Sequence, residues 1–281
     1  MIRLAFSTNA FKKNTLDEAI DAIGDIGYAG VELMADLHHA YPPAMDTLRR
    51  QQTLHHLCNR LLPVSNVNAF TLFACGDTYH PTWIEHDAAR REQRIEHTFN
   101  CIDLAAQFGA RTISLQPGGP LIGTGLSREE ASQRYADGIA RVLPAVNAKN
   151  LILAIEPEPG LLIQTAGEYL EFKDRFFKNE PNVLMNCDIG HLFCVGDDPA
   201  AVVRENPAHI AHVHLEDIGS NRVHQHLTPG KGAIDFAQIF AALDDIDYAG
   251  WVTVELYPYE TTAAGVAKAA WKHLQPMLPE H

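Results

Sequence analysis

Four side chains able to bind a metal follow short apolar runs in the second half of the sequence. They are Glu156, Asp188, His214 and Glu255. One acid after such a run is more typical of a helix cap or a salt-bridge partner, but four after successive runs indicate a shared site. Crowded carboxylates repel one another unless a cation lies between them. Three carboxylates and one imidazole suit Mn²⁺, Mg²⁺, Co²⁺ or Zn²⁺, and the hard oxygen donors favour Mn²⁺ or Mg²⁺. We therefore expect one divalent metal ion.

These residues need a scaffold that brings the ends of four runs together. Runs of strand length alternate with helical patterns along the whole chain. The predicted strands are 4–7, 30–34, 64–70, 112–115, 151–155, 183–187, 210–215 and 251–256. The predicted helices are 14–27, 45–62, 88–108, 127–147, 165–177, 199–205, 235–243 and 262–278. Such alternation predicts a parallel sheet, because a crossover helix is the usual connection between parallel neighbours.

Eight strand–helix units predict a closed (β/α)8 TIM barrel. The chain has 281 residues, and a barrel of this type needs about 250, so we expect a single domain over 1–281. No Gly-x-Gly-x-x-Gly follows the first strand, which disfavours a dinucleotide-binding sheet. The active site of such a barrel lies at the C-terminal ends of its strands. The four candidate ligands would therefore share one rim of the barrel mouth.

Charge and cysteine content narrow the partners and the compartment. The formal net charge is −13, which disfavours nucleic acid as a partner and suits a small neutral substrate. The five cysteines form no Cys-x-x-Cys pair, and an odd, widely spaced set favours a reducing cytoplasm. The sequence shows neither a signal peptide nor an apolar run of about 18 residues, so we expect no membrane partner. The sequence leaves open whether the protein forms a homo-oligomer.

Five short segments carry a resemblance to a known family. They are Ile-Glu-Pro at 155–157, Cys-Asp-Ile-Gly-His at 187–191, His-Val-His-Leu-Glu-Asp at 212–217, Pro-Gly-Lys-Gly-Ala-Ile-Asp-Phe at 229–236 and Thr-Val-Glu at 253–255. In these segments the chain resembles the xylose-isomerase-like barrel superfamily. The similar branch is that of the sugar-phosphate isomerases and epimerases, which includes the ketose 3-epimerases.

The resemblance implies a role for each candidate ligand. It identifies Glu156, Asp188, His214 and Glu255 as metal ligands, and Glu156 and Glu255 also as the acid/base pair. Two carboxylates on roughly opposite sides of a hydroxy-ketone can remove a proton from one face and return it to the other. The metal would polarise the carbonyl and stabilise the enediolate.

The resemblance also implies substrate contacts. It places Glu158 and His191 near the substrate oxygens. Arg222 resembles the substrate-contacting arginine of the family, although it follows His214 by eight residues, a longer spacing than the family has. We also interpret His226 as a substrate contact.

Related phosphodiesterases, which cut DNA at abasic sites, carry Asp-x-His at the position of 224–226 as ligands of a multi-zinc cluster. This chain has His224 at the first of these positions. It also has Asn68 and Gln116 at the strand ends where the nuclease pattern needs histidines. The nuclease cluster is therefore incomplete.

The first half of the chain offers weaker candidates. Glu32 ends the second predicted strand, where it would support the metal or contact the substrate. Asn9, Asn66 and Asn68 lie near strand ends and could bind hydroxyl groups, although asparagine is also a common turn residue.

Four functions remain open from the sequence. The leading hypothesis is a metal-dependent isomerase or epimerase that acts on a sugar, a sugar phosphate or a polyol-derived ketone. The nearest rival is a lyase, such as a keto-inositol or keto-sugar dehydratase, which would expel a β-hydroxyl with the same groups. An abasic-site phosphodiesterase and a non-catalytic binding barrel are the other two.

Overall fold

Parallel strands close into a barrel in the computed structural model, which describes residues 1–278. The last three residues of the predicted 1–281 domain lie outside the described part. The strands are β1 (Arg3–Ser7), β2 (Gly30–Met34), β3 (Val64–Asn68), β4 (Thr112–Leu115), β5 (Ile152–Ile155), β6 (Val183–Asp188), β7 (Ile210–Leu215) and β8 (Trp251–Val254). Each strand pairs in parallel with its neighbours in chain order, and β1 pairs with β8. The predicted (β/α)8 barrel is confirmed.

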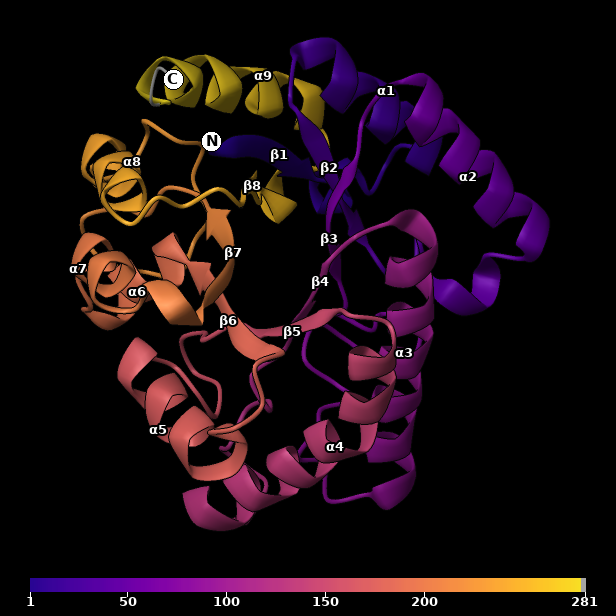
Figure 1. The fold of residues 1–281 in the computed structure, drawn as a ribbon, viewed down its shortest axis with the longest axis vertical. Helices are drawn as coiled ribbons and strands as arrows, with labels where there is room; N and C mark the ends of the chain where they lie inside the picture. Colours follow the sequence, from indigo (N-terminus) through magenta and orange to yellow (C-terminus); the bar gives the residue numbers. More distant parts are fainter. Residues whose placement is uncertain (279–281) are drawn as a thin grey trace.

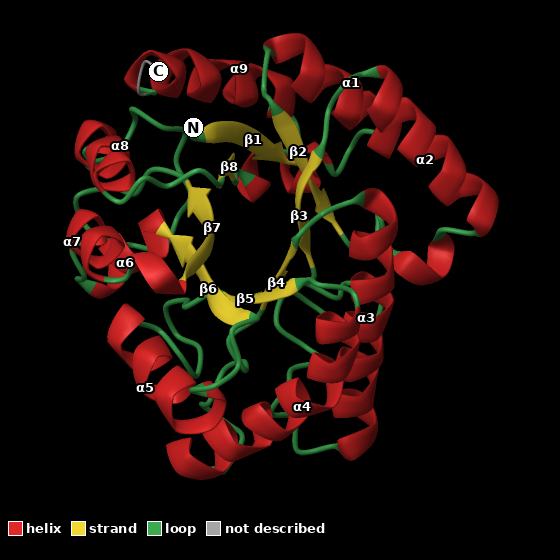
Figure 2. Ribbon diagram, in the orientation of Figure 1, coloured by secondary structure: helices red, strands yellow, loops and turns green. Residues whose placement is uncertain are grey.

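The helices form an outer ring around the strands, as Figure 2 shows in red around yellow. They are α1 (Leu16–Ile26), α2 (Thr47–Asn59), α3 (Ala88–Phe108), α4 (Arg128–Ala148), α5 (Ala166–Phe177), α6 (Ile189–Val195), α7 (Pro199–Glu205), α8 (Phe236–Asp245) and α9 (Ala263–Leu274). Short 3-10 turns cover Thr8–Phe11, Pro42–Ala44, Pro207–His209, Tyr257–Tyr259 and Gln275–Met277. In Figure 1 the chain runs once around the ring, so that α9 returns beside α1. None of the helices within residues 1–278 combines the length and apolarity that a bilayer crossing requires.

Local sequence explains where several helices begin. Thr15, Ser127 and Thr165 each cap a helix by accepting a hydrogen bond from the backbone three residues on. A glutamate at that third position bonds back to the cap residue in all three cases. This reciprocal arrangement satisfies two backbone donors that the first helical turn leaves free.

The structure differs from the predicted elements near the site. Strand β3 ends at Asn68 rather than at 70, and β8 ends at Val254 rather than at 256. The chain leaves the sheet early at these points, which releases Glu255 from the strand. Helix α6 was not predicted from the sequence, because it begins directly at the end of β6, with Asp188 as its N-cap, where the sequence indicated a strand end and a loop.

The strand pleat divides β2 between two environments. Successive side chains of a strand point to opposite faces. Glu32 faces the barrel interior, where it contacts Asn66 and His214 from other strands. Val31 and Leu33 are fully buried in the apolar core. The barrel interior therefore holds a polar layer directly beneath its mouth.

Candidate active site

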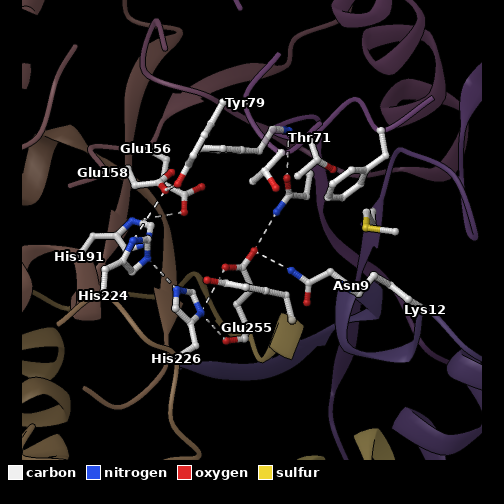
Figure 3. A pocket seen from close by; sticks show the side chains of 16 residues that line it. Asn9, Lys12, Thr71, Tyr79, Glu156, Glu158, His191, His224, His226 and Glu255 are labelled. Carbon is white, nitrogen blue, oxygen red and sulfur yellow. Dashed lines mark hydrogen bonds and ion pairs between the residues drawn. The ribbon is translucent and has the colours of Figure 1, made fainter. Parts of the chain in front are cut away.

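A pocket of about 220 Å³ opens at the carboxyl ends of the strands (Figure 3). Its lining comes from residues that end or follow a strand, and from the loops beyond. The lining residues are Asn9, Lys12, Met34, Asn68, Phe70, Thr71, Phe73, Thr78, Tyr79, Glu156, Glu158, His191, His224, His226, Glu255 and Tyr257. The pocket thus lies where a barrel of this type is expected to hold its active site.

The structure brings together the four residues that the sequence singled out as ligands. Glu156 follows β5, Asp188 ends β6, His214 lies on β7 and Glu255 follows β8. One potential ligand atom from each residue lies within 4.8 Å of those from the other three. All four side chains are buried.

His214 lies at the centre of this group of four. Its Nδ1 atom is 3.2 Å from Glu156 Oε1, 3.9 Å from Asp188 Oδ2 and 3.9 Å from Glu255 Oε1. Asp188 Oδ1 accepts the backbone N–H of His191 and so caps α6, whereas Asp188 Oδ2 is buried without a hydrogen-bond partner. An orphaned carboxylate oxygen beside two other carboxylates is a fitting position for a cation.

Amide side chains hold the two glutamates in place. Asn9 and Asn68 both donate from Nδ2 to Glu255 Oε1, at 2.8 Å and 3.1 Å. Asn186, on β6, donates to Glu156 Oε2 at 2.8 Å. Figure 3 shows Asn9 reaching Glu255 from the side of the pocket opposite the histidines. The sequence indicated that Asn9 and Asn68 could bind hydroxyl groups, and it did not indicate these contacts with the carboxylates.

Burial and mutual repulsion perturb the titration of this cluster. Burial raises the pKa of Glu255 well above its ordinary value, and also raises the pKa of Glu156. Burial disfavours a charged ring at His214, but Glu32 and Glu156 outweigh it and raise the pKa of His214 well above its ordinary value. Protons therefore balance part of the negative charge, and a divalent cation would compete with them for the same atoms.

A second acidic layer lies deeper in the barrel. Glu32 Oε2 is 2.6 Å from His214 Nε2, on the side of the ring away from Glu156. Burial opposes ionisation of Glu32, yet the charge and hydrogen bond of His214 lower the pKa of Glu32 to about 2. Glu32 therefore contacts a candidate ligand and does not line the pocket.

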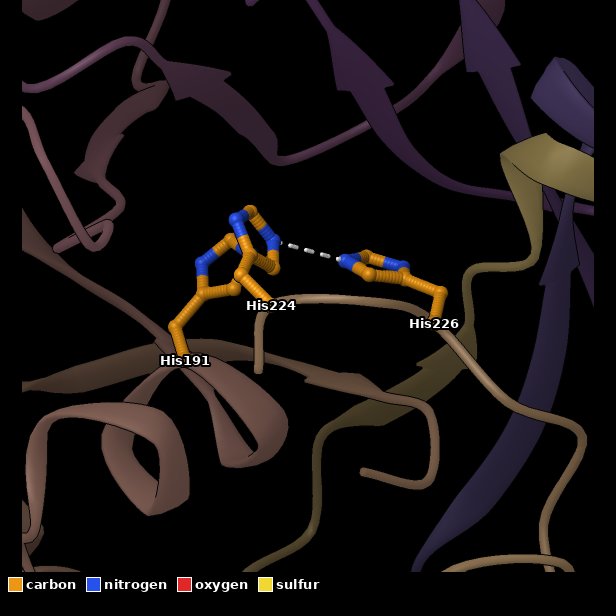
Figure 4. Close-up of side chains that lie close together, drawn as sticks. All are labelled: His191, His224 and His226. Carbon is orange, nitrogen blue, oxygen red and sulfur yellow. Dashed lines mark hydrogen bonds between the residues drawn. The ribbon is translucent and has the colours of Figure 1, made fainter. Parts of the chain in front are cut away.

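Three histidines form one wall of the pocket (Figure 4). The Nδ1–H groups of His191 and His226 donate to the carbonyls of Pro157 and Glu255, at 3.1 Å and 3.0 Å. His224 Nε2 lies 3.1 Å from His226 Nε2. Burial lowers the pKa of all three rings, that of His226 to about 3. The wall is therefore neutral near pH 7 and can exchange hydrogen bonds with a polar ligand.

Glu158 also lines the pocket, and it is paired with a tyrosine. The Tyr79 hydroxyl donates to Glu158 Oε1 at 3.0 Å. Burial and the neighbouring Glu156 raise the pKa of Glu158 well above its ordinary value. Lys12, Tyr79 and Tyr257 line the same pocket. Sequence reasoning missed these three residues, because they lie in loops and turns that no periodic pattern marks.

The structure places Arg222 away from the pocket. Its exposed side chain stacks over Phe193 at 4.6 Å and donates to the Phe193 carbonyl at 3.1 Å. Arg222 is not among the residues that line the pocket.

Asp217, in the segment 212–217, organises a loop instead of entering the pocket. Its carboxylate accepts the backbone N–H groups of Gly230, Gly232 and Ile234, at 2.9, 2.7 and 3.2 Å. A Cβ atom at Gly232 would lie 2.3 Å from Asp217 Oδ1, so this approach requires glycine. The two segments 212–217 and 229–236 therefore depend on each other for their conformation.

Sequence comparison identifies a family and several relatives. The model of the xylose isomerase-like TIM barrel family matches residues 20–277. The inosose dehydratase of Clostridium beijerinckii is 26% identical over 270 residues, covering 87% of this chain and 83% of that protein. The inosose dehydratase of Lacticaseibacillus casei is 24% identical over 270 residues, with 87% and 83% covered.

Solved structures share the fold at lower identity. The 3-keto-D-glucoside 4-epimerase YcjR of E. coli has a TM-score of 0.80 and 17% identity, over 98% of this chain and all of that one. The D-psicose 3-epimerase of Clostridium cellulolyticum H10, solved with D-tagatose, has a TM-score of 0.80 and 15% identity, over 99% and 100%. The IolI protein, which was solved with a zinc atom, has a TM-score of 0.79 and 16% identity, over 98% of each chain.

Proposed function

The chain belongs to the family of xylose isomerase-like TIM barrels, and we propose that it is a divalent-metal-dependent isomerase or epimerase that acts on a small hydroxy-ketone of the sugar or inositol class. One observation carries the proposal. Glu156 and Glu255 enter the same pocket from the ends of two different strands. A carboxylate oxygen of each lies within 4.8 Å of potential ligand atoms of His214 and Asp188. Such a pair can exchange a proton with a substrate that lies between them.

The residues present suit a bound metal ion. Glu156, Asp188, His214 and Glu255 would hold it, and the orphaned Asp188 Oδ2 would gain a partner. The IolI protein, a fold neighbour, was solved with a zinc atom. The oxygen-rich donor set here favours Mn²⁺ or Mg²⁺, and Zn²⁺ or Co²⁺ also suit it. When bound, such an ion supplies Lewis-acid polarisation of a carbonyl group.

The two glutamates would move the proton. One glutamate, as a carboxylate, would remove the proton from the carbon beside the carbonyl, and the other, as a carboxylic acid, would donate its own proton to the opposite face. Asn9 and Asn68 fix the direction of Glu255, and Asn186 fixes that of Glu156. Orientation of both bases before substrate binds lowers the cost of reaching a reactive geometry.

The pocket wall would bind the remaining hydroxyl groups of the substrate. His191, His226 and Glu158 present hydrogen-bonding groups to the pocket. Lys12 is the sole lysine or arginine among the described lining residues, against three glutamates. This balance favours an uncharged ketone over a phosphorylated sugar. Because Arg222 points to Phe193, we assign it no contact with the substrate.

A solvent exchange experiment tests the proposal. The protein with Mn²⁺ is incubated in D2O with a panel of unphosphorylated ketoses and inososes, and deuterium incorporation is followed by NMR. We expect metal-dependent incorporation at the carbon next to the carbonyl of at least one compound, and loss of incorporation after chelation. Absence of exchange across the panel would contradict the proposal.

A dehydratase is the second candidate, and the sequence relatives favour it. Relatives that cover 87% of this chain are inosose dehydratases. The same base would remove the proton, and a glutamic acid of the pair would then protonate the β-hydroxyl, which would leave as water, in place of protonating the carbon. The mass of the product separates the two reactions, because dehydration lowers it by one water and epimerisation leaves it unchanged.

The phosphodiesterase hypothesis has less support from the pocket. Asn68 and Gln116 stand where that hypothesis needs histidines, and both amides are already engaged. Asn68 donates to Glu255, and Gln116 donates to the Tyr79 carbonyl. Counting the metal ions bound per chain tests this point, because a trinuclear site would require three.

A further inference from the structure

Glu32 has an unusual set of contacts for a residue outside the pocket. It is fully buried on β2, and its carboxylate receives three side-chain groups. Asn66 Nδ2 donates to Oε2 at 2.8 Å, Asn68 Nδ2 donates to Oε1 at 3.3 Å, and His214 Nε2 lies 2.6 Å from Oε2. His212 Nε2 is farther away, at 3.6 Å from Oε2. The closest contact of this buried acid is therefore with a candidate metal ligand.

We propose that Glu32 is a positioning residue, which fixes the tautomer and the orientation of His214 and, through Asn68, the direction of Glu255. This inference rests on the metal site of the proposed function. Glu32 itself would touch neither the ion nor the substrate.

Hydrogen-bond chemistry fixes the tautomer. Asn66 and Asn68 each direct an amide N–H at one of the two Glu32 oxygens, so the contacts present both oxygens as acceptors. The hydrogen in the 2.6 Å contact must therefore belong to His214 Nε2. In the neutral ring, Nδ1 then carries the lone pair. Nδ1 is the atom that faces Glu156, Asp188 and Glu255 at 3.2–3.9 Å.

This arrangement also gives a reason for an acid inside the barrel. A ligating histidine usually donates its other ring N–H to a carboxylate or a carbonyl, which orients the ring and makes it a stronger donor to the metal. A glutamine would fill the same space and could accept the same hydrogen bond, but without a negative charge it would not strengthen His214 as a donor to the metal to the same extent. Packing alone therefore does not account for a glutamate at this position.

Asn68 carries the same influence to a second ligand. Its Nδ2 group donates to Glu32 Oε1 at 3.3 Å and to Glu255 Oε1 at 3.1 Å. Because one amide group serves both carboxylates, a shift of Glu32 would turn Asn68 and weaken its hold on Glu255. One acid on β2 thus supports candidate ligands on β7 and after β8.

Metal affinity and the His214 tautomer test the inference together. Mn²⁺ and Zn²⁺ affinities are measured for wild type, Glu32→Gln and Glu92→Gln. The last variant is a matched control, because Glu92 pairs with Arg141 on the surface. We expect Glu32→Gln to bind each ion about 10- to 100-fold more weakly, as for other groups that support a metal ligand, and Glu92→Gln to bind as wild type does. Glu32→Asp should recover part of the loss, since it keeps the charge.

The tautomer is read from the wild-type protein, labelled with ¹⁵N at histidine and loaded with Zn²⁺. We expect the proton on Nε2 of His214 and the metal on Nδ1, with the resonance assigned by its loss in His214→Gln. This reading stands even where Glu32→Gln does not fold.

Two results would overturn the inference alone: a proton on Nδ1, or a folded Glu32→Gln variant that binds both ions within twofold of wild type. Wild-type protein that binds neither ion would instead overturn the metal site of the proposed function, and the inference with it.

Discussion

The two halves of the barrel mouth carry different chemistry. The strand ends of the second half present Glu156, Asp188, His214 and Glu255. The strand ends of the first half present the uncharged amides Asn9, Asn68 and Gln116. The acids converge on one point, and two of the amides donate their N–H groups to one of those acids.

This division separates reactivity from orientation. Crowded carboxylates can bind a cation or move a proton, but repulsion would drive them apart without support. Amide donors stabilise a carboxylate without adding a positive charge that would repel a metal ion. Glu32 is the exception in the first half, and it acts on the second half through His214. The first half of the mouth therefore helps to orient Glu255 and His214, whereas Glu156 is oriented from within the second half by Asn186.

The largest expected effect comes from the acid half. Glu156→Gln and Glu255→Gln keep the size of each side chain but remove its ability to accept a proton. We expect each substitution to reduce deuterium exchange into the substrate by about 10²- to 10⁴-fold, the usual contribution of a positioned acid or base. The measurement is the exchange rate at saturating Mn²⁺, with Glu92→Gln as the surface control. Exchange at the wild-type rate in both variants would show that other groups move the proton.

The sequence could predict the acid half because its signals are local. Each of Glu156, Asp188 and Glu255 follows an apolar run, and the strand–helix alternation places those ends on one rim. The pairing of Asn9 and Asn68 with Glu255 could not be predicted. For Asn68 the reason is that β3 and β8 are not neighbours in the sheet, so its contact depends on the barrel radius and on side-chain direction across the interior. Asn9 follows β1, which does pair with β8, and its contact depends on the 3-10 turn after that strand.

The contacts made by loops and short helices could not be predicted from the sequence either. Helix α6 follows β6 without a connecting loop and was not predicted, yet its N-cap is Asp188. Tyr79 reaches Glu158 from a long connection between β3 and α3. Such contacts depend on tertiary packing and not on residue pattern.

The amide half should give the next largest effect. Asn9→Ala removes one of the two amide donors to Glu255 Oε1 and leaves Asn68 in place. A hydrogen bond to a charged group contributes about 1.5–3 kcal/mol, so we expect exchange to fall by roughly tenfold to a hundredfold. Metal stoichiometry should stay unchanged. Asn147→Ala, at a surface pair with Asn182, is the matched control. A loss as large as that of Glu255→Gln would mean that Asn9 acts on the substrate itself.

Lowering the pH should weaken metal binding, because protons compete with the metal ion at His214, Glu156 and Glu255. The raised pKa values of His214, Glu156 and Glu255 mean that a metal ion must displace protons as the pH falls. The sign follows directly, because affinity is lost towards low pH, by about tenfold per unit for each proton displaced. Calorimetry in buffers of different ionisation enthalpy would count those protons between pH 6 and 8. Binding without proton release would contradict the charge balance described for this cluster.

The smallest effect is expected at Arg222, which lies outside both halves of the mouth. Its guanidinium stacks on Phe193 and bonds to the Phe193 carbonyl, and its side chain is exposed. Substitutions at such exposed positions usually change the free energy of unfolding by less than about 0.5 kcal/mol. Arg222 also does not line the pocket. We therefore expect Arg222→Ala to leave KM and kcat within about twofold of wild type, whereas Lys12→Ala, which alters the pocket lining, should raise KM. A tenfold rise in KM for Arg222→Ala would mean that the Arg222 side chain moves into the pocket when substrate binds. Its guanidinium would then lie beside the carboxylates of the second half.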